Sequence, residues 1–337
     1  MQQYPDISLS EDWYNDRLGA NFGEDFWLDP IRRTENFMQL SYETAKKFPH
    51  LGLGSLEPKP APIASDQYSH RFMPKLFGCE VVYTQNQAPS AVSLGLEIEE
   101  LANFPMPDLH KNEVLKKAIS DAGVLKRKYG YVHSGINTGS PLNVAVSVFG
   151  ESFLASLAGE PETARHILMM IAKTEMRLIY EYTQLIDENY GISPLHMGYG
   201  NCPAIMVSPE LYKKTVLPVD LWVRQQCEYF HLHHCGIFDN YAELYTALSP
   251  ASLDVGGFSD YCKLREYFPE TPCSFIINPE SIEGQSRENI DALICGVIAD
   301  GGPAENISAL RSYGISKNAT DENLVDFRTS AVRQNFA

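Results

Sequence analysis

Short apolar runs alternate with longer helical stretches over the last two thirds of the chain. This order predicts strands at 131–134, 195–200, 230–235, 252–256, 273–277 and 307–315. A helical stretch follows each run, and single crossovers of this length imply parallel strands. The pattern therefore predicts six βα units after residue 128.

Capping signals mark where the helical stretches begin. Pro161 stands at a first-turn position of a helix predicted over 161–187, which Asn189-Tyr190-Gly191 closes. The other starts lie at hydroxyl residues that are favoured N-caps, namely Ser208, Ser259, Ser286 and Thr320. A further helix is predicted from Asn240 to Leu248.

Residues 70–127 have room for two more units, with a strand around 77–83 and a helix over 111–128. Eight such units close an α/β fold as a (β/α)₈ TIM barrel. We therefore predict a barrel domain over 70–337. Residues 1–69 contain six prolines and do not follow the alternation, so we expect an irregular N-terminal cap packed on the barrel.

The densest group of reactive side chains is His231-Leu232-His233-His234-Cys235-Gly236. Alternation along a strand sends His231, His233 and Cys235 to one face and His234 to the other. Imidazole and thiolate are preferred zinc ligands, and they also transfer protons near neutral pH. A buried strand whose histidines bond to carbonyls would explain any single histidine equally well, but for the whole group we favour a functional role.

Barrel active sites lie at the carboxyl ends of the strands. The side chains expected there are His133, Asn137, His196, Asn201, Cys202, Asp260, Asn278 and Tyr313, besides the histidine strand. Acids are few among them, which favours metal ligation or hydrogen bonding to a neutral ligand over hydrolysis by paired carboxylates. Motifs for a serine hydrolase, a P-loop or a dinucleotide site are absent from the sequence.

Composition limits the partners. The net charge of −16 over 337 residues argues against nucleic acid or an anionic membrane, and it allows docking of a basic partner. No apolar run reaches the length of a membrane span, and the polar N-terminus does not resemble a signal peptide. Seven scattered cysteines fit reduced thiols in the cytoplasm.

Five motifs in order resemble the uroporphyrinogen decarboxylase-like superfamily, whose members are (β/α)₈ barrels. They are Gly139-Ser140-Pro141-Leu142, Val207–Tyr212 with Leu217-Pro218, His233-His234-Cys235-Gly236, Ile277-Asn278-Pro279 and Gly314–Asn323. The decarboxylases themselves carry an arginine-rich motif after a tryptophan. The stretch Asp25–Arg33 does not match it.

The chain more closely resembles the corrinoid-dependent methyltransferase branch, and within it methyltransferase I of anaerobic O-demethylases. The resemblance implies transfer of a methyl group from a methoxy-aromatic such as guaiacol, vanillate or veratrol to cob(I)alamin. That cobalamin cofactor is carried by a separate corrinoid protein. The sequence is also compatible with a homodimer of this chain.

The thiol-methylating relatives bind zinc through His-x-Cys on one strand and a cysteine near the end of the last strand. His233 and Cys235 match the pair, but Tyr313 stands at the last position, and Cys295 is expected in mid-helix. Zinc is therefore left open, with Cys202 or His196 as further ligands. Glu160, Glu175 and His196 also fit a Glu-x14-Glu-x20-His zinc pattern of methyltransferase I proteins.

The resulting hypothesis assigns roles by side-chain chemistry. Histidines would assist the departing phenolate, with His233, His234 and His133 as candidates. Substrate-binding candidates are Asn137, Asn201, Asp260, Asn278 and Tyr313, and apolar walls would come from Trp13, Tyr14, Phe22, Phe26 and Trp27. The alternatives are another methyl donor or a thiol acceptor, a tetrapyrrole decarboxylase, and a non-catalytic ligand-binding barrel.

Overall fold

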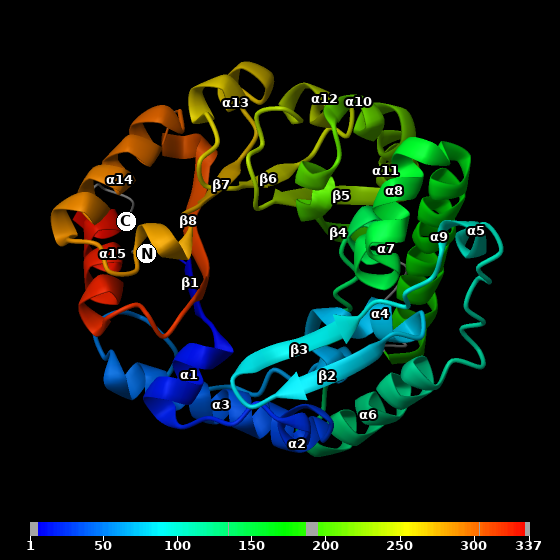
Figure 1. The fold of residues 1–337 in the computed structure, drawn as a ribbon. Coiled ribbons are helices and arrows are strands. Elements are labelled where there is room, and N and C mark those ends of the chain that lie inside the picture. Colours follow the sequence, from blue (N-terminus) through cyan, green and yellow to red (C-terminus); the bar gives the residue numbers. More distant parts are fainter. Residues whose placement is uncertain (1–5, 134, 187–194, 303, 334–337) are drawn as a thin grey trace.

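The computed structural model describes residues 6–133, 135–186, 195–302 and 304–333. Figure 1 shows the elements arranged as a ring around a central axis. One side of the ring is a six-stranded parallel sheet in the order β1-β8-β7-β6-β5-β4. The α/β class is thereby confirmed, and the curled half-barrel sheet with helices outside it is consistent with a TIM-like barrel.

Five of the predicted strands form this sheet with bounds close to those expected. They are β4 (Leu195–Gly200), β5 (Cys227–His234), β6 (Ser252–Val255), β7 (Cys273–Ile276) and β8 (Ile307–Ile315). β5 begins three residues before the predicted start at Phe230.

The N-terminal segment is not the irregular cap that its prolines suggested. Strand β1 (Asp6–Leu9) pairs in parallel with β8 and extends the sheet at one edge. Three helices follow, α1 (Glu11–Leu18), α2 (Glu24–Trp27) and α3 (Pro30–Lys47). β6 and β7 are equally short but are continuous buried runs, whereas β1 contributes only Ile7 and Leu9 as apolar residues and alternates with exposed ones, so the search for apolar runs missed it.

The other predicted early strands do not join the sheet. Residues around 77–83 form β2 (Glu80–Thr84), which pairs antiparallel with β3 (Gln87–Val92). The strand expected at 131–134 is reduced to one bridge between Ile63 and His133. Pro62 accepts from the His133 amide at 2.9 Å but has no amide of its own to continue a ladder. Among the described residues, strand pairing therefore does not close the barrel between β1 and β4.

Helices cover the outside of the ring and supply part of its wall. Before β4 lie α4 (Phe72–Leu76), α5 (Ile98–Leu101), α6 (Glu113–Tyr129), α7 (Pro141–Phe149), α8 (Glu151–Gly159) and α9 (Pro161–Ile186). After β4 come α10 (Pro209–Leu211), α11 (Leu217–Gln225), α12 (Ala242–Thr246), α13 (Tyr261–Tyr267), α14 (Arg287–Asp300) and α15 (Asp321–Arg333).

Most of the predicted caps are confirmed. Hydroxyls of Ser208, Ser286 and Thr320 accept from backbone amides three residues on, at 3.1 to 3.3 Å. The cap expected at Ser259 is wrong by one residue, because Asp260 caps α13 instead. The predicted closure at Asn189–Gly191 lies outside the described residues.

The aromatic side chains of the N-terminal segment belong to the hydrophobic core rather than to a ligand pocket. Trp13 joins the main core, whereas Phe22, Phe26 and Trp27 form a smaller buried cluster with Leu40. No single described helix has both the length and the apolar character to cross a bilayer; only α7 and α8 taken together, bent by 117°, meet those criteria.

A close backbone contact fixes the end of β5. The Gly256 amide donates to the His234 carbonyl at 2.8 Å. A Cβ on Gly256 would lie 2.3 Å from the carbonyl oxygen of Cys235 and 2.4 Å from that of Gly236. The chain after β6 can therefore lie this close to the turn at Cys235 only because residue 256 has no side chain.

We expect Gly256→Ala to lower the free energy of unfolding by roughly 2–3 kcal/mol, since two strand ends must move apart. The control is Gly296→Ala in α14, whose Cβ meets nothing within 4 Å. That substitution should leave stability unchanged or raise it by up to about 1 kcal/mol. Urea unfolding of both variants measures the difference, and equal stabilities would contradict the close contact.

Candidate functional site

Three metal-ligating side chains meet at the carboxyl ends of β4 and β5. One donor atom each from Cys202, His233 and Cys235 lies within 4.8 Å of the other two. Cys202 and His233 are half-buried and Cys235 is exposed. Two sulfur donors and one imidazole nitrogen form a donor set that suits zinc. We refer to these residues below as the Cys-His-Cys cluster.

The two strands place this cluster by their register. Gly200 at the end of β4 pairs with His233, and the Asn201 amide donates to the His233 carbonyl at 2.8 Å. Cys202 therefore emerges beside the end of β5. The predicted alternation of β5 is confirmed, because Leu232 and His234 are fully buried on one face while His231 and His233 lie half-buried on the other.

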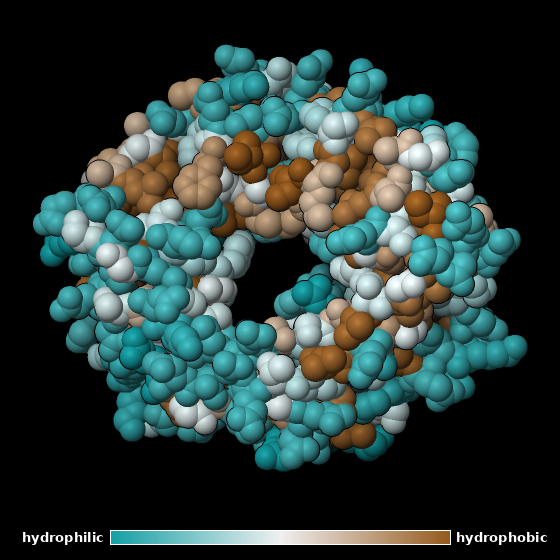
Figure 2. Space-filling view, viewed as in Figure 1, coloured by the Kyte–Doolittle hydropathy of each residue, from teal (hydrophilic) through white to brown (hydrophobic). Residues whose placement is uncertain are grey.

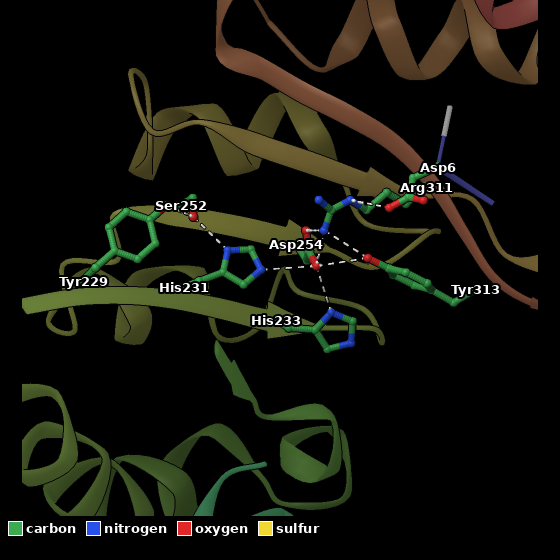
Figure 3. A network of polar contacts seen from close by, with 8 residues as sticks. All are labelled: Asp6, Tyr229, His231, His233, Ser252, Asp254, Arg311 and Tyr313. Carbon is green, nitrogen blue, oxygen red and sulfur yellow. Dashed lines mark hydrogen bonds and ion pairs between the residues drawn. The ribbon is translucent and has the colours of Figure 1, made fainter. Parts of the chain in front are cut away.

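A carboxylate on the neighbouring strand β6 orients His233. Asp254 on β6 lies 3.3 Å from His233 Nδ1, 3.2 Å from His231 Nε2 and 3.0 Å from Arg311 Nη1. Figure 3 shows these side chains pointing toward Asp254 from β5 and β8, with Tyr313 on the same side. A carboxylate on Nδ1 leaves Nε2 of His233 for the thiols, as in many carboxylate–histidine–zinc sites.

The electrostatics of the cluster favour a thiolate beside an imidazolium. Burial alone would lower the pKa of His233, but its hydrogen bonds to Asp254 and Cys202 raise it to about 9. The hydrogen bond from Cys202 lowers the pKa of Cys235 to about 7. The same bond, together with burial, raises the pKa of Cys202 to about 12. The cluster therefore holds one shared thiol proton, which a metal ion would displace.

A cavity of about 230 Å³ opens against this cluster. Its lining residues come from the segment before α4, from α4 and α7, and from the ends of β4 and β5. They are His70, Arg71, Pro74, Asn137, Thr138, Gly139, Asn143, Val144, Ser147, Gly200, Cys202 and His233. Figure 2 shows this ring-shaped molecule hollowed at its centre.

The structure brings five of the residues singled out from the sequence to this region. Cys202, His233 and Cys235 form the cluster, and Asn137 lines the cavity. Tyr313 donates toward Asp254 at 3.5 Å, and its ring lies 6.1 Å from that of His233. Tyr313, where the resemblance implied a zinc-binding cysteine, therefore contacts the orienting carboxylate.

His234 is placed on the opposite face of β5, away from the cavity. Its Nδ1 lies 2.9 Å from the Tyr245 hydroxyl, and its ring packs against Phe238, Tyr241 and Tyr245. Burial and the nearby charge of His233 lower the pKa of His234 to about 4. His234 is thus a neutral core histidine, and the geometry gives it no contact with a ligand in the cavity.

Four other predicted residues are not brought to the cavity. His133 is exposed, with its ring 5.6 Å from that of Tyr131. His196 lies at the start of β4, four residues or about 13 Å below Gly200, and so it is not at a strand end. Asp260 caps α13 through the Lys263 amide at 3.0 Å, and Asn278 follows β7 half-buried.

Asn201 is fully buried and belongs to an internal polar network. Its Nδ2 donates to the Tyr212 hydroxyl at 2.9 Å and to Asp220 at 3.3 Å. Both Tyr199 and Tyr212 donate to the Asp220 carboxylate. Burial nevertheless raises the pKa of Asp220 to about 7, because it outweighs these hydrogen bonds.

The Glu-x14-Glu-x20-His pattern does not form a metal cluster among the described residues. Glu160 is exposed at the end of α8, whereas Glu175 is fully buried in α9. Burial and the nearby Asp220 raise the pKa of Glu175 well above its usual range. Within the described chain its carboxylate oxygens have no hydrogen-bond partner, which fits a neutral acid rather than a zinc ligand.

Three side chains of this region were not predicted from the sequence. Asp254 is a lone acid within an apolar strand, and a buried acid of this kind is a sequence signal for a polar site. His70 and Arg71 lie before α4 in a stretch without a clear pattern, so nothing in the sequence pointed to their place beside the cluster.

Comparison with known proteins identifies a solved structure with a similar fold. No family model matches the chain, and no curated protein matches it in sequence. A solved structure described as a methyltransferase from Methanosarcina mazei superposes over 100% of this chain and 95% of its own, with a TM-score of 0.64 and 15% identity. The two chains therefore share a fold along their whole length.

We expect the purified protein to bind one zinc ion per chain with all three cluster residues intact. Cys202→Ser and Cys235→Ser should each lower zinc affinity at least tenfold, because each removes a thiolate ligand. The matched control is Cys295→Ser, an exposed position in mid-helix as predicted. Competition with a chromophoric chelator measures the affinity, and equal zinc affinity in all variants would contradict the site.

The buried acid Asp220 should make stability fall as the pH rises. Its pKa of about 7 in the folded state lies above the value of about 3.9 for an unfolded aspartate. The stabilising contribution is therefore complete below pH 4 and is lost as the pH rises through 7. Relative to Asp220→Asn, the wild type should lose roughly 2–4 kcal/mol of unfolding free energy between pH 4 and 8.

Urea unfolding across this pH range measures the difference between the two proteins. The exposed Asp25→Asn variant is the control and should follow the wild-type profile. Parallel profiles for wild type and Asp220→Asn would show that Asp220 does not take up a proton on folding.

Proposed function

We propose that the chain is a corrinoid-dependent methyltransferase that moves a methyl group from a methoxy-aromatic to cob(I)alamin on a separate corrinoid protein. The observation that carries this proposal is the Cys-His-Cys cluster, of which Cys202 and His233 line a cavity of about 230 Å³. The fold shared with a methyltransferase structure adds support at the level of architecture.

The cavity is smaller than the usual range of drug-sized pockets, which begins near 300 Å³. It suits a single substituted ring better than a tetrapyrrole, and this favours methyl transfer over tetrapyrrole decarboxylation. The amides of Asn137 and Asn143 line it and can orient ring substituents by hydrogen bonds.

Aryl ether cleavage needs help at the oxygen, because a phenolate is a poor leaving group at neutral pH. A zinc ion bound to the cluster would supply a Lewis acid for that oxygen. The chain itself contributes Cys202, His233 and Cys235 as ligands, and Asp254 fixes the ring of His233. In the metal-free protein the raised pKa of His233 makes it a proton donor at the same place.

Exposed apolar side chains on consecutive loops support docking of the corrinoid protein. Ile205 and Met206 follow β4, Ile237 follows β5 and Phe258 follows β6, each with 49 to 74% of its surface exposed. These loops lie at the strand ends that carry the cluster, and Figure 2 shows hydrophobic residues gathered around part of the ring. Apolar groups gathered on one rim are typical of protein interfaces.

A thiol acceptor is the second candidate, and one observation favours it. In the sequence, Tyr313 occupies the position at which a third zinc ligand was expected. In the structure, Cys202 is the third potential ligand beside His233 and Cys235. A four-coordinate zinc ion with three protein ligands has one free coordination position, which a substrate thiolate can occupy.

The test mixes the zinc-loaded protein with guaiacol, vanillate or veratrol and free cob(I)alamin. We expect loss of cob(I)alamin absorbance together with an equal amount of the demethylated phenol. His233→Ala should slow methyl transfer at least 100-fold, since the leaving oxygen loses the Lewis acid or proton donor that stabilises it. His166→Ala, at an exposed position of α9, is the control and should react as the wild type does.

His234→Gln separates the two histidines, because His234 has no contact with the cavity. It should keep the wild-type rate while losing some stability. A folded, zinc-loaded protein that transfers no methyl group from any of the ethers, yet methylates a thiol from a methylated corrinoid, would replace the first proposal by the second.

A further inference from the structure

The cavity beside the cluster is lined by an arginine and by no described acid, although the protein as a whole is acidic. His70, Arg71 and His233 line it, and its described lining residues include no aspartate or glutamate. The formal charge of the chain is −16, with 43 acidic against 27 basic side chains. A pocket lined by a guanidinium and by no acid in such a chain is suited to an anionic ligand.

Arg71 is the cation in this pocket that protein groups do not satisfy. It is half-buried, and its Nε has no hydrogen-bond partner among the described residues. The described part of the chain also offers it no ion pair. By contrast, buried Arg33 donates to the carbonyls of Trp27 and Ile63, and Arg265 donates to four backbone carbonyls.

A guanidinium left without partners in a partly desolvated site is costly, and burial indeed lowers the pKa of Arg71. The natural partner of its planar fork is a carboxylate, which accepts two parallel hydrogen bonds.

The backbone just before Arg71 is strained. Ser69 has φ 50° and ψ −137°, a left-handed conformation that non-glycine residues seldom adopt. Its hydroxyl lies 2.9 Å from Nδ1 of His70. An unfavourable backbone conformation persists only where the surrounding structure enforces it, and such conformations are frequent at ligand-binding sites. Here this conformation precedes the two residues that enter the cavity.

We propose that Arg71 binds the carboxylate of the substrate, so that the methyl donors are methoxybenzoates rather than neutral methoxybenzenes. Arg71 and the residues Cys202 and His233 line the same small cavity. A ring held by its carboxylate at Arg71 therefore presents its ether substituents toward the cluster. This inference rests on the proposed methyl transfer and specifies its substrate class.

The test is calorimetric titration of the zinc-loaded protein with 3-methoxybenzoate and with its neutral analogue 3-methoxybenzamide. The wild type should bind the benzoate about 10- to 100-fold more tightly than the amide. Arg71→Gln should lose that preference while binding the amide as the wild type does, and amide binding also reports that the variant is folded. Arg71→Lys should keep part of the preference, because it retains the charge without the fork.

Arg127→Gln, at an exposed position of α6, is the matched control and should keep the full preference. Equal binding of benzoate and amide by the wild type would overturn the inference. So would an unchanged benzoate preference in Arg71→Gln.

Methyl transfer assays separate this inference from the proposal on which it rests. Methyl transfer from methoxybenzene as fast as from methoxybenzoate, unaffected by Arg71→Gln, overturns the carboxylate contact and leaves methyl transfer standing. Arg71-dependent benzoate binding without transfer of any methyl group supports the anion site and contradicts the proposed reaction.

Discussion

The site depends on the contacts that the Asp254 carboxylate on β6 makes with side chains of β5 and β8. This carboxylate joins β5, β6 and β8 through His233, His231 and Arg311, and it leaves one nitrogen of His233 for the thiols. Burial alone would raise the pKa of this buried carboxylate, but its hydrogen bonds to His231 and His233 and the charge of Arg311 hold the pKa well below its usual range, so Asp254 stays ionised. The polar interior and the Cys-His-Cys cluster are therefore parts of one arrangement.

The two faces of β5 show how one strand carries both structure and chemistry. His233 faces the polar interior, where hydrogen bonds to Asp254 and Cys202 favour its charged form. His234, the next residue, faces the aromatic layer beneath the helices, where burial keeps it neutral. Two adjacent histidines thus have pKa values shifted in opposite directions, because alternation along the strand places them in different surroundings.

The sequence was informative where patterns are long or chemistry is dense. Five strands of the sheet, the long helix over 161–186 and the pairing of His233 with Cys235 were predicted from periodicity, caps and spacing. The strand β1 and the hairpin of β2 and β3 were not, since these strands are half-exposed and lack the continuous buried run that marks β6 and β7. Arg71 and Asp254 reach the site through tertiary packing, which a local pattern does not encode.

The central claim is that Cys202, His233 and Cys235 hold one zinc ion beside the cavity. X-ray absorption at the zinc edge of the loaded protein tests this most directly, because it counts sulfur and nitrogen neighbours without requiring turnover. The account predicts two sulfur ligands and one imidazole in the wild type, with one sulfur lost in Cys202→Ser. A zinc shell without sulfur, or one unchanged by Cys202→Ser, would contradict it.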